Sequence, residues 1–172
     1  MHVDMRLTKH HGLGNDFLVL LDHDGSTPLG ADLARRLCHR TEGIGADGLI
    51  RATRPARAGA EIAFELRNAD GSVAEVSGNG LRCLVQAAVM AGWLEPGSPA
   101  TITTVAGDRV ASVEVPGHPT MTIAVDMGPV VGGEAQPGSL QGSAEEDRGL
   151  DVGPLQGPAE EPRREDPGAG ID

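Results

Sequence analysis

The sequence predicts an α+β domain in which a mostly antiparallel sheet wraps around one central apolar helix. Short segments of alternating apolar and polar residues outnumber helical ones, and glycine- or proline-rich turns join many of them directly, which favours antiparallel hairpins. One helical segment, 81–91, is apolar on almost every side, so we expect the sheet to bury it. The expected order of elements, β-β-α-β-β-α-β-β-β, differs from that of a doubly wound nucleotide-binding sheet.

The first expected elements are two strands, 6–10 and 17–21, joined by the glycine-rich turn His11–Gly14. Leucines and arginines fall on opposite faces of 32–40, which predicts an amphipathic helix. A run of glycines then ends this part of the chain before a strand at 49–52.

The next expected strand, 62–67, places Ile, Phe and Leu on one face, and Asn68–Ser72 is a strong turn signal. The apolar helix 81–91 follows, with Gly92 as its C-terminal stop. The last expected strands form a meander: 100–105, 108–115 and 121–126.

Composition divides the chain near residue 133. The segment after it holds seven glycines, five prolines and only five Leu, Ile or Val residues, and its ten acids against three arginines give a net charge of −7. Such a segment buries too little apolar surface to offset an ordering cost of about 1–2 kcal/mol per residue. We therefore expect a globular lobe over 1–133 and an acidic, Pro/Gly-rich disordered tail over 134–172.

Charge and composition exclude several classes of function. A net charge of −11 argues against a nucleic-acid partner. No apolar run reaches the ~18 residues of a membrane span, and the first eight residues lack the apolar core of a signal peptide, so we expect no membrane partner and a cytoplasmic protein. The six histidines show no metal-ligand spacing, so no metal site is expected. Cys38 and Cys83 are expected to be reduced thiols within helices.

Three loops combine glycine with asparagine, where a main-chain turn could meet an anion: Gly12–Phe17, Asn68–Ser72 and Ser77–Gly80. Each of them alone is also what an ordinary turn requires, because Gly and Asn tolerate positive φ.

The third loop carries more information, because Gly78-Asn79-Gly80 leads directly into the apolar helix. Unpaired backbone N–H groups at a helix N-terminus bind a carboxylate or a phosphate. Ser77 would lie beside such a ligand, at a position where the helix end favours an anionic side chain. No lysine follows, so the loop is not a phosphate loop of the Gly-x₄-Gly-Lys type.

Taken together and in order, four motifs closely resemble the signatures of the diaminopimelate epimerase family. These motifs are Lys9–Phe17, Gly43–Gly48, Arg67–Ser72 and Ser77–Arg82. Val125–Gly128 is also similar to the strand that closes the first half of that family. The resemblance covers roughly residues 5–130.

The resemblance implies a cytoplasmic, cofactor-independent epimerase that interconverts LL- and meso-diaminopimelate in lysine biosynthesis. Its substrate would be this small amino acid, and a homodimer is left open. Two bases act in that family, both cysteines, one from each of two similar lobes. By the resemblance, Asn15 and Asn68 would hydrogen-bond the substrate, and the backbone of Gly78 and Asn79 would bind its α-carboxylate. Ser77 would occupy the position of the first catalytic cysteine.

Two features of the sequence differ from that family. A serine hydroxyl at position 77 holds its proton far more tightly than a thiol of pKa about 8.5. The segment after residue 133 does not resemble the second lobe and has no cysteine, which predicts a truncated epimerase with little activity alone. Two alternatives stay open: a related cofactor-independent isomerase or dehydratase of the same superfold that uses one base, and a non-catalytic truncated lobe.

Overall fold

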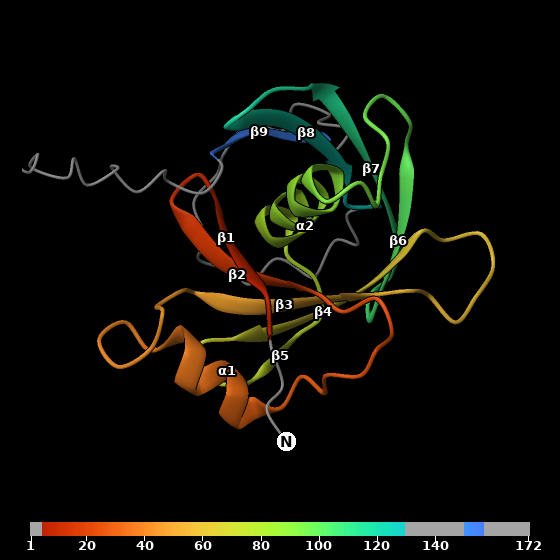
Figure 1. Ribbon diagram of the computed structural model, residues 1–172. Coiled ribbons are helices and arrows are strands. Elements are labelled where there is room, and N and C mark those ends of the chain that lie inside the picture. The colour runs from red at the N-terminus through yellow and green to blue at the C-terminus, as the bar shows by residue number, and fades with distance from the viewer. Residues whose placement is uncertain (1–4, 130–149, 157–172) are drawn as a thin grey trace, which may run out of the picture.

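A strongly curled, mixed sheet surrounds one helix in this computed structural model, which describes residues 5–129 and 150–156 (Figure 1). The strands follow the order β3-β2-β1-β9-β8-β7-β6-β4-β5, and a further pairing of β3 with β4 closes the sheet on itself. In chain order the elements are β1 Leu7–Gly12, β2 Asn15–Leu21, α1 Ala31–Cys38, β3 Gly48–Thr53, β4 Ile62–Asn68, β5 Val73–Ala74, α2 Gly78–Met90, β6 Ala100–Thr104, β7 Gly107–Val115, β8 Thr120–Asp126 and β9 Leu150–Gln156.

Antiparallel pairings dominate the sheet, as the sequence predicts. The exceptions are β2 with β3 and β4 with β6, which run parallel. Helix α1 forms the connection between β2 and β3, because parallel neighbours need a long crossover. The predicted α+β class, with a mostly antiparallel sheet around a central apolar helix, is confirmed.

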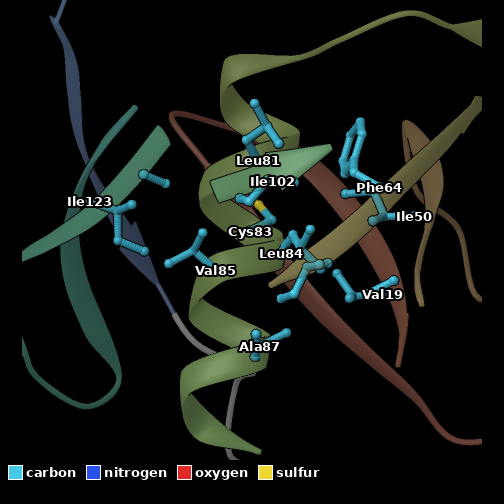
Figure 2. Packing of buried hydrophobic residues seen from close by; sticks show 14 of the residues in the cluster. Val19, Ile50, Phe64, Leu81, Cys83, Leu84, Val85, Ala87, Ile102 and Ile123 are labelled. Atoms are coloured by element: carbon cyan, nitrogen blue, oxygen red, sulfur yellow. The ribbon is translucent and has the colours of Figure 1, made fainter. Parts of the chain in front are cut away.

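Helix α2 lies inside the curled sheet, and its apolar side chains form the centre of the main core (Figure 2). Leu81, Leu84 and Val85 point to different walls of the sheet, because apolar residues occupy most of the circumference of the helix. The strands supply the facing side chains of this core: Val19, Ile50, Phe64, Ile102 and Ile123.

A second, smaller core lies on the outer face of β2 and β3, under α1. Leu18 and Leu49 point into it, whereas Phe17, Val19 and Ile50 point toward α2. These two strands are therefore buried on both faces, which explains why β2 has a continuous apolar run over 17–21 rather than an alternating pattern.

One buried polar network connects α2 to the wall of the sheet. Gln86 Oε1 lies 2.7 Å from His10 Nδ1, and Gln86 Nε2 donates to the Pro119 carbonyl at 2.9 Å. His10 Nε2 lies 2.9 Å from the Thr8 hydroxyl. Burial lowers the pKa of His10, only partly offset by its contact with Gln86, so the ring is held neutral.

The observed elements depart from the expected ones most clearly at α2 and β5. Helix α2 begins at Gly78, three residues earlier than predicted, because Ser77 caps its N-terminus. Strand β5 was not expected, since two residues are too short for a pattern.

Neither helix of the described part is long and apolar enough to cross a membrane.

Strand β9, Leu150–Gln156, lies within the segment for which the sequence predicts a disordered tail. It pairs with β8 at seven positions and with β1 at two. The pairing uses backbone groups, and the facing edges of β8 and β1 offer unpaired N–H and C=O groups to a strand of almost any composition. The other residues after 129 lie outside the described ranges, so the boundary at 133 stays a prediction.

We expect Leu84→Ala to lower the free energy of unfolding by about 2–5 kcal/mol. The Leu84 side chain has no exposed surface, so its truncation leaves a cavity in the core. Leu13→Ala is the matched control: Leu13 is 67% exposed, so the same truncation there should cost less than about 0.5 kcal/mol. Urea unfolding followed by circular dichroism measures both. Equal losses at the two positions would contradict the placement of α2 in the core.

The neutral state of His10 predicts a pH dependence of stability. The unfolded chain protonates this ring with an ordinary pKa of about 6.5, whereas the folded chain resists protonation. The unfolded state therefore binds more protons as the pH falls below that value, and the contribution of His10, complete above it, is progressively lost. His10→Gln should show a shallower decline of unfolding free energy between about pH 7 and 5 than the unmodified chain. Parallel pH profiles would refute this.

Candidate functional site

Three loops meet at one end of the curled sheet. In the parallel pair β2 and β3, Phe17 lies opposite Gly48, and in the antiparallel pair β3 and β4, Gly48 lies opposite Asn68. The turn before β2, the loop before β3 and the loop after β4 therefore share this end. The first turn of α2 reaches it as well, because a Cβ on Gly80 would be 3.5 Å from the side chain of Ile50, in β3. All the glycine–asparagine loops singled out in the sequence are thus brought together.

Ser77 caps α2 with both its backbone and its side chain. Its hydroxyl oxygen accepts a hydrogen bond from the Gly80 N–H at 3.0 Å, and its carbonyl accepts from the Leu81 N–H at 2.8 Å. The tight approach favours glycine at position 80, where a Cβ would lie 3.2 Å from that of Ser77. The hydroxyl is half-buried at the positive end of the helix dipole, where negative charge is stabilised.

Gly78 and Asn79 open the helix beside Ser77. Their backbone N–H groups lie in the first turn, where no carbonyl of the same helix can accept from them. The first turn contains no acidic residue, so no side chain of the helix itself competes for an anion there. Asn79 Oδ1 accepts from the Arg82 guanidinium, whose side chain is 1% exposed. Arg82 thus holds the Asn79 side chain at the first turn of α2.

Asn15 and Asn68 come from the two neighbouring loops. Asn15 follows a two-residue turn in which Leu13 has φ +53° and Gly14 has φ +87°, the conformation that a tight hairpin requires. Within the described ranges, the Asn15 side chain makes no hydrogen bond to another residue, so its amide is available to a ligand. Asn68 is exposed and donates through Nδ2 to the Ser72 hydroxyl at 2.9 Å.

The Asn68 loop is fixed against α1. Gly71 has φ +84°, and a Cβ there would come within 2.8 Å of the Ala31 carbonyl, so only glycine fits. Arg35 Nε donates to the Asp70 carbonyl at 2.8 Å, which holds the loop from the other side.

An ionic cluster of Lys9, Asp16, Arg40 and Asp47 joins the loops. The Arg40 guanidinium binds both carboxylate oxygens of Asp16, at 2.8 and 2.7 Å, and Asp47 Oδ1 at 2.6 Å. Lys9 Nζ lies 3.1 Å from Asp16. These contacts, that of Arg40 above all, hold the pKa of Asp16 well below its usual range.

Asp47 extends this cluster to the third loop through its backbone. Its N–H donates to the Asp16 carbonyl and its carbonyl accepts from the Ala69 N–H, both at 2.9 Å. Asp47 Oδ2 also accepts from the Asp16 N–H at 3.0 Å. The residue after Asn15 and the residue after Asn68 are therefore both bonded to Asp47, which fixes the two asparagine loops relative to each other.

No pattern in the sequence predicts a role for Asp16, Arg40 or Asp47. Asp16 and Asp47 lie within two of the motifs that carry the family resemblance, which was the signal available. Arg40 is 24 residues from Asp16 in the chain, and no local pattern connects them.

Both cysteines are buried, so neither presents its thiol at the surface. Both are free thiols in helices, as expected. Cys83 points into the main core, where burial raises the pKa of its thiol to about 12 (Figure 2). Cys38 packs in the core under α1, and burial raises its pKa as well. Across residues 5–129 and 150–156, no group of three or more His, Cys, Asp or Glu side chains is placed to hold a metal ion.

We expect Arg40→Gln to loosen both asparagine loops. The amide hydrogens of Asp47 and Ala69 should exchange with solvent several-fold faster, and the pKa of Asp16 should rise toward its usual value because its largest stabilising contact is lost. Arg36→Gln is the matched control, since Arg36 is an exposed arginine of α1 outside the cluster. Hydrogen exchange and carboxyl chemical shifts followed by NMR measure both effects. Identical behaviour of the two variants would show that the cluster does not hold the loops.

Comparison with known proteins gives consistent results for sequence and fold. The family model for diaminopimelate epimerase matches residues 7–132. The diaminopimelate epimerase of Desulfitobacterium hafniense is 37% identical over 153 residues, which cover 86% of this chain and 53% of that protein. That of Thermobifida fusca is 41% identical over 138 residues, 73% of this chain and 48% of that protein. The chain therefore spans about half the length of these curated relatives.

Solved structures share the fold at low identity. A probable proline racemase from Agrobacterium radiobacter K84, with bound carbonate, has a TM-score of 0.57 at 20% identity, covering 70% of this chain and 41% of the other. A phenazine biosynthesis protein of the PhzF family from Bacillus anthracis has a TM-score of 0.54, also at 20% identity, covering 72% and 40%. These structures support the fold alone. The family match over residues 7–132 and the identity to the curated relatives show that this chain belongs to the diaminopimelate epimerase family.

Proposed function

We propose that this chain is the first lobe of a diaminopimelate epimerase, and that the end of the sheet where the three loops meet binds one amino-acid end of diaminopimelate. The observation that carries the proposal is the N-terminus of α2, with its backbone N–H groups at Gly78 and Asn79 open beside Ser77. Asn15 and Asn68 flank it from loops that the ionic cluster holds together.

Each group has a role that its chemistry suits. The α-carboxylate of the substrate accepts hydrogen bonds from the N–H groups of Gly78 and Asn79, assisted by the helix dipole. Asn15 and Asn68 bind and orient the amino and carboxylate groups. This places the α-carbon of the substrate next to Ser77, the position we assign to the first catalytic cysteine of the family.

Ser77 limits the chemistry that this lobe performs. Removing an α-proton requires a base, and racemising that carbon requires an acid on the opposite face. The Ser77 hydroxyl stays protonated at neutral pH and already accepts a hydrogen bond as the cap of α2. We therefore propose binding without turnover by this chain alone, with cytoplasmic location and a role in lysine biosynthesis following from the family.

Binding and reactivity are tested separately with Ser77→Cys. A thiol at the N-terminus of α2 should have a lowered pKa and react readily with iodoacetamide, and added meso-diaminopimelate should slow this alkylation. Ser98→Cys is the matched control, in the exposed loop between α2 and β6 and outside the proposed site: it should react without such protection. Mass spectrometry after timed alkylation measures both.

The unmodified chain should bind diaminopimelate, shifting the amide resonances of Gly78 and Asn79, but should not incorporate deuterium at the α-carbon of the LL-isomer. Steady deuterium incorporation by the unmodified chain would overturn the assignment of Ser77 as an inert base. Equal protection of the cysteines introduced at positions 77 and 98, or protection of neither, would overturn the assignment of the binding site.

A further inference from the structure

A second cleft lies at the opposite end of α2 from Ser77. Helix α2 is 13 residues long, so the two ends are about 20 Å apart. The cleft has a volume of about 640 Å³, within the usual range of about 300–1,000 Å³ for small-molecule sites. Its walls are His23 after β2, the loop 54–60 between β3 and β4, and Trp93 after α2. The loop 54–60 projects at the right of Figure 1.

A chain of hydrogen bonds orients one arginine in this cleft. Arg54 Nε lies 2.6 Å from His23 Nε2, and His23 Nδ1 lies 2.8 Å from Asp24 Oδ1. The Nε of arginine can only donate, so His23 Nε2 accepts, and its proton is on Nδ1, which donates to Asp24. Arg54 is thereby fixed through Nε alone. In the part of the chain that the structure describes, its two terminal amino groups bind no other residue.

The other charged side chains that line the cleft, Arg57 and Glu61, already have partners. Arg57 pairs with Asp108, and the Glu61 carboxylate accepts from the Thr101 N–H at 2.6 Å. Among the cations lining the cleft in the described ranges, Arg54 is thus the one with no carboxylate partner. The acids nearby disfavour a ligand with several negative charges.

Trp93 supplies an apolar wall next to Arg54. Its ring meets that of His23 edge to face, with centroids 5.6 Å apart and an interplanar angle of 84°. Trp93 is partly buried against the main core, so its position is fixed while part of the indole borders the cleft. The Trp93 indole can stack on an aromatic ring, and the two unbound terminal amino groups of Arg54 can bind one carboxylate. Together they suit a planar ligand that carries a single carboxylate.

We propose that this cleft binds a small aromatic monocarboxylate, whose carboxylate is held by both terminal amino groups of Arg54 and whose ring packs on Trp93. The planar guanidinium matches a carboxylate through two parallel hydrogen bonds, which a lysine could not provide. The site is separate from the loops around Ser77 and does not depend on the function proposed for them.

The single tryptophan of the sequence makes a direct test available. In the ¹⁵N-labelled full chain, 4-fluorobenzoate should shift the indole N–H resonance saturably, with a Kd in the millimolar range. The neutral 4-fluorobenzamide should bind at least about tenfold more weakly, because it lacks the charge that Arg54 recognises. Diaminopimelate should leave this resonance unmoved, which separates the result from the test of the Ser77 site.

Arg54→Gln should weaken binding of 4-fluorobenzoate by about tenfold. Arg54→Lys keeps the positive charge but loses the two parallel N–H donors of the guanidinium, so it should weaken binding by several-fold. Arg36→Gln, an exposed arginine of α1, is the matched control and should bind like the unmodified chain. Arg54 is exposed, so its replacement should leave the amide spectrum otherwise dispersed. The proposal is overturned if the indole resonance does not move, if the amide binds as well as the acid, or if Arg54→Gln keeps full affinity.

Discussion

The burial of α2 inside the curled sheet is the constraint on which the rest of this lobe depends. A helix enclosed on all sides can expose only its ends, so its first turn becomes the one place where its backbone N–H groups can meet a ligand. The same enclosure requires partners for the polar groups it buries. Gln86 obtains them from His10 and the Pro119 carbonyl. The core thus positions the site as well as stabilising the fold.

Electrostatic contacts then fix what packing leaves free. Loops at the end of a sheet have few apolar contacts, and the loops carrying Asn15 and Asn68 belong to different hairpins. Asp47 bonds the residue that follows each of them, and Arg40 neutralises the two carboxylates that this arrangement brings together. Without that guanidinium, Asp16 and Asp47 would repel each other across the site. The cluster therefore matters for position more than for stability.

Sequence patterns predicted those features that depend on local composition. Alternation and turn signals identified the strands of the core, and the apolar circumference of 81–91 identified the enclosed helix. The three glycine–asparagine loops were also identified, because such turns have a strong local signature. The missed features depend on the fold instead. The pairing of Arg40 with Asp16 joins distant segments, and β9 is placed by the open backbone of β8 rather than by its own composition. The assignment of Ser77 to the first cysteine position stays a prediction.

At Ser77, stability and chemical reactivity place opposite demands on one side chain. A serine hydroxyl is among the better N-cap groups, and replacing such a cap costs about 0.5–2 kcal/mol. A thiol is a weaker hydrogen-bond acceptor, so it would support the first turn of α2 less well, but it ionises near neutral pH at the positive end of a helix. If the proposed function holds, the base needed for proton abstraction and the cap needed by an enclosed helix are in competition at this position. With serine the lobe keeps the cap, and the anion site proposed at the backbone N–H groups of Gly78 and Asn79 is retained, because that site depends on the direction of the helix and not on the identity of residue 77.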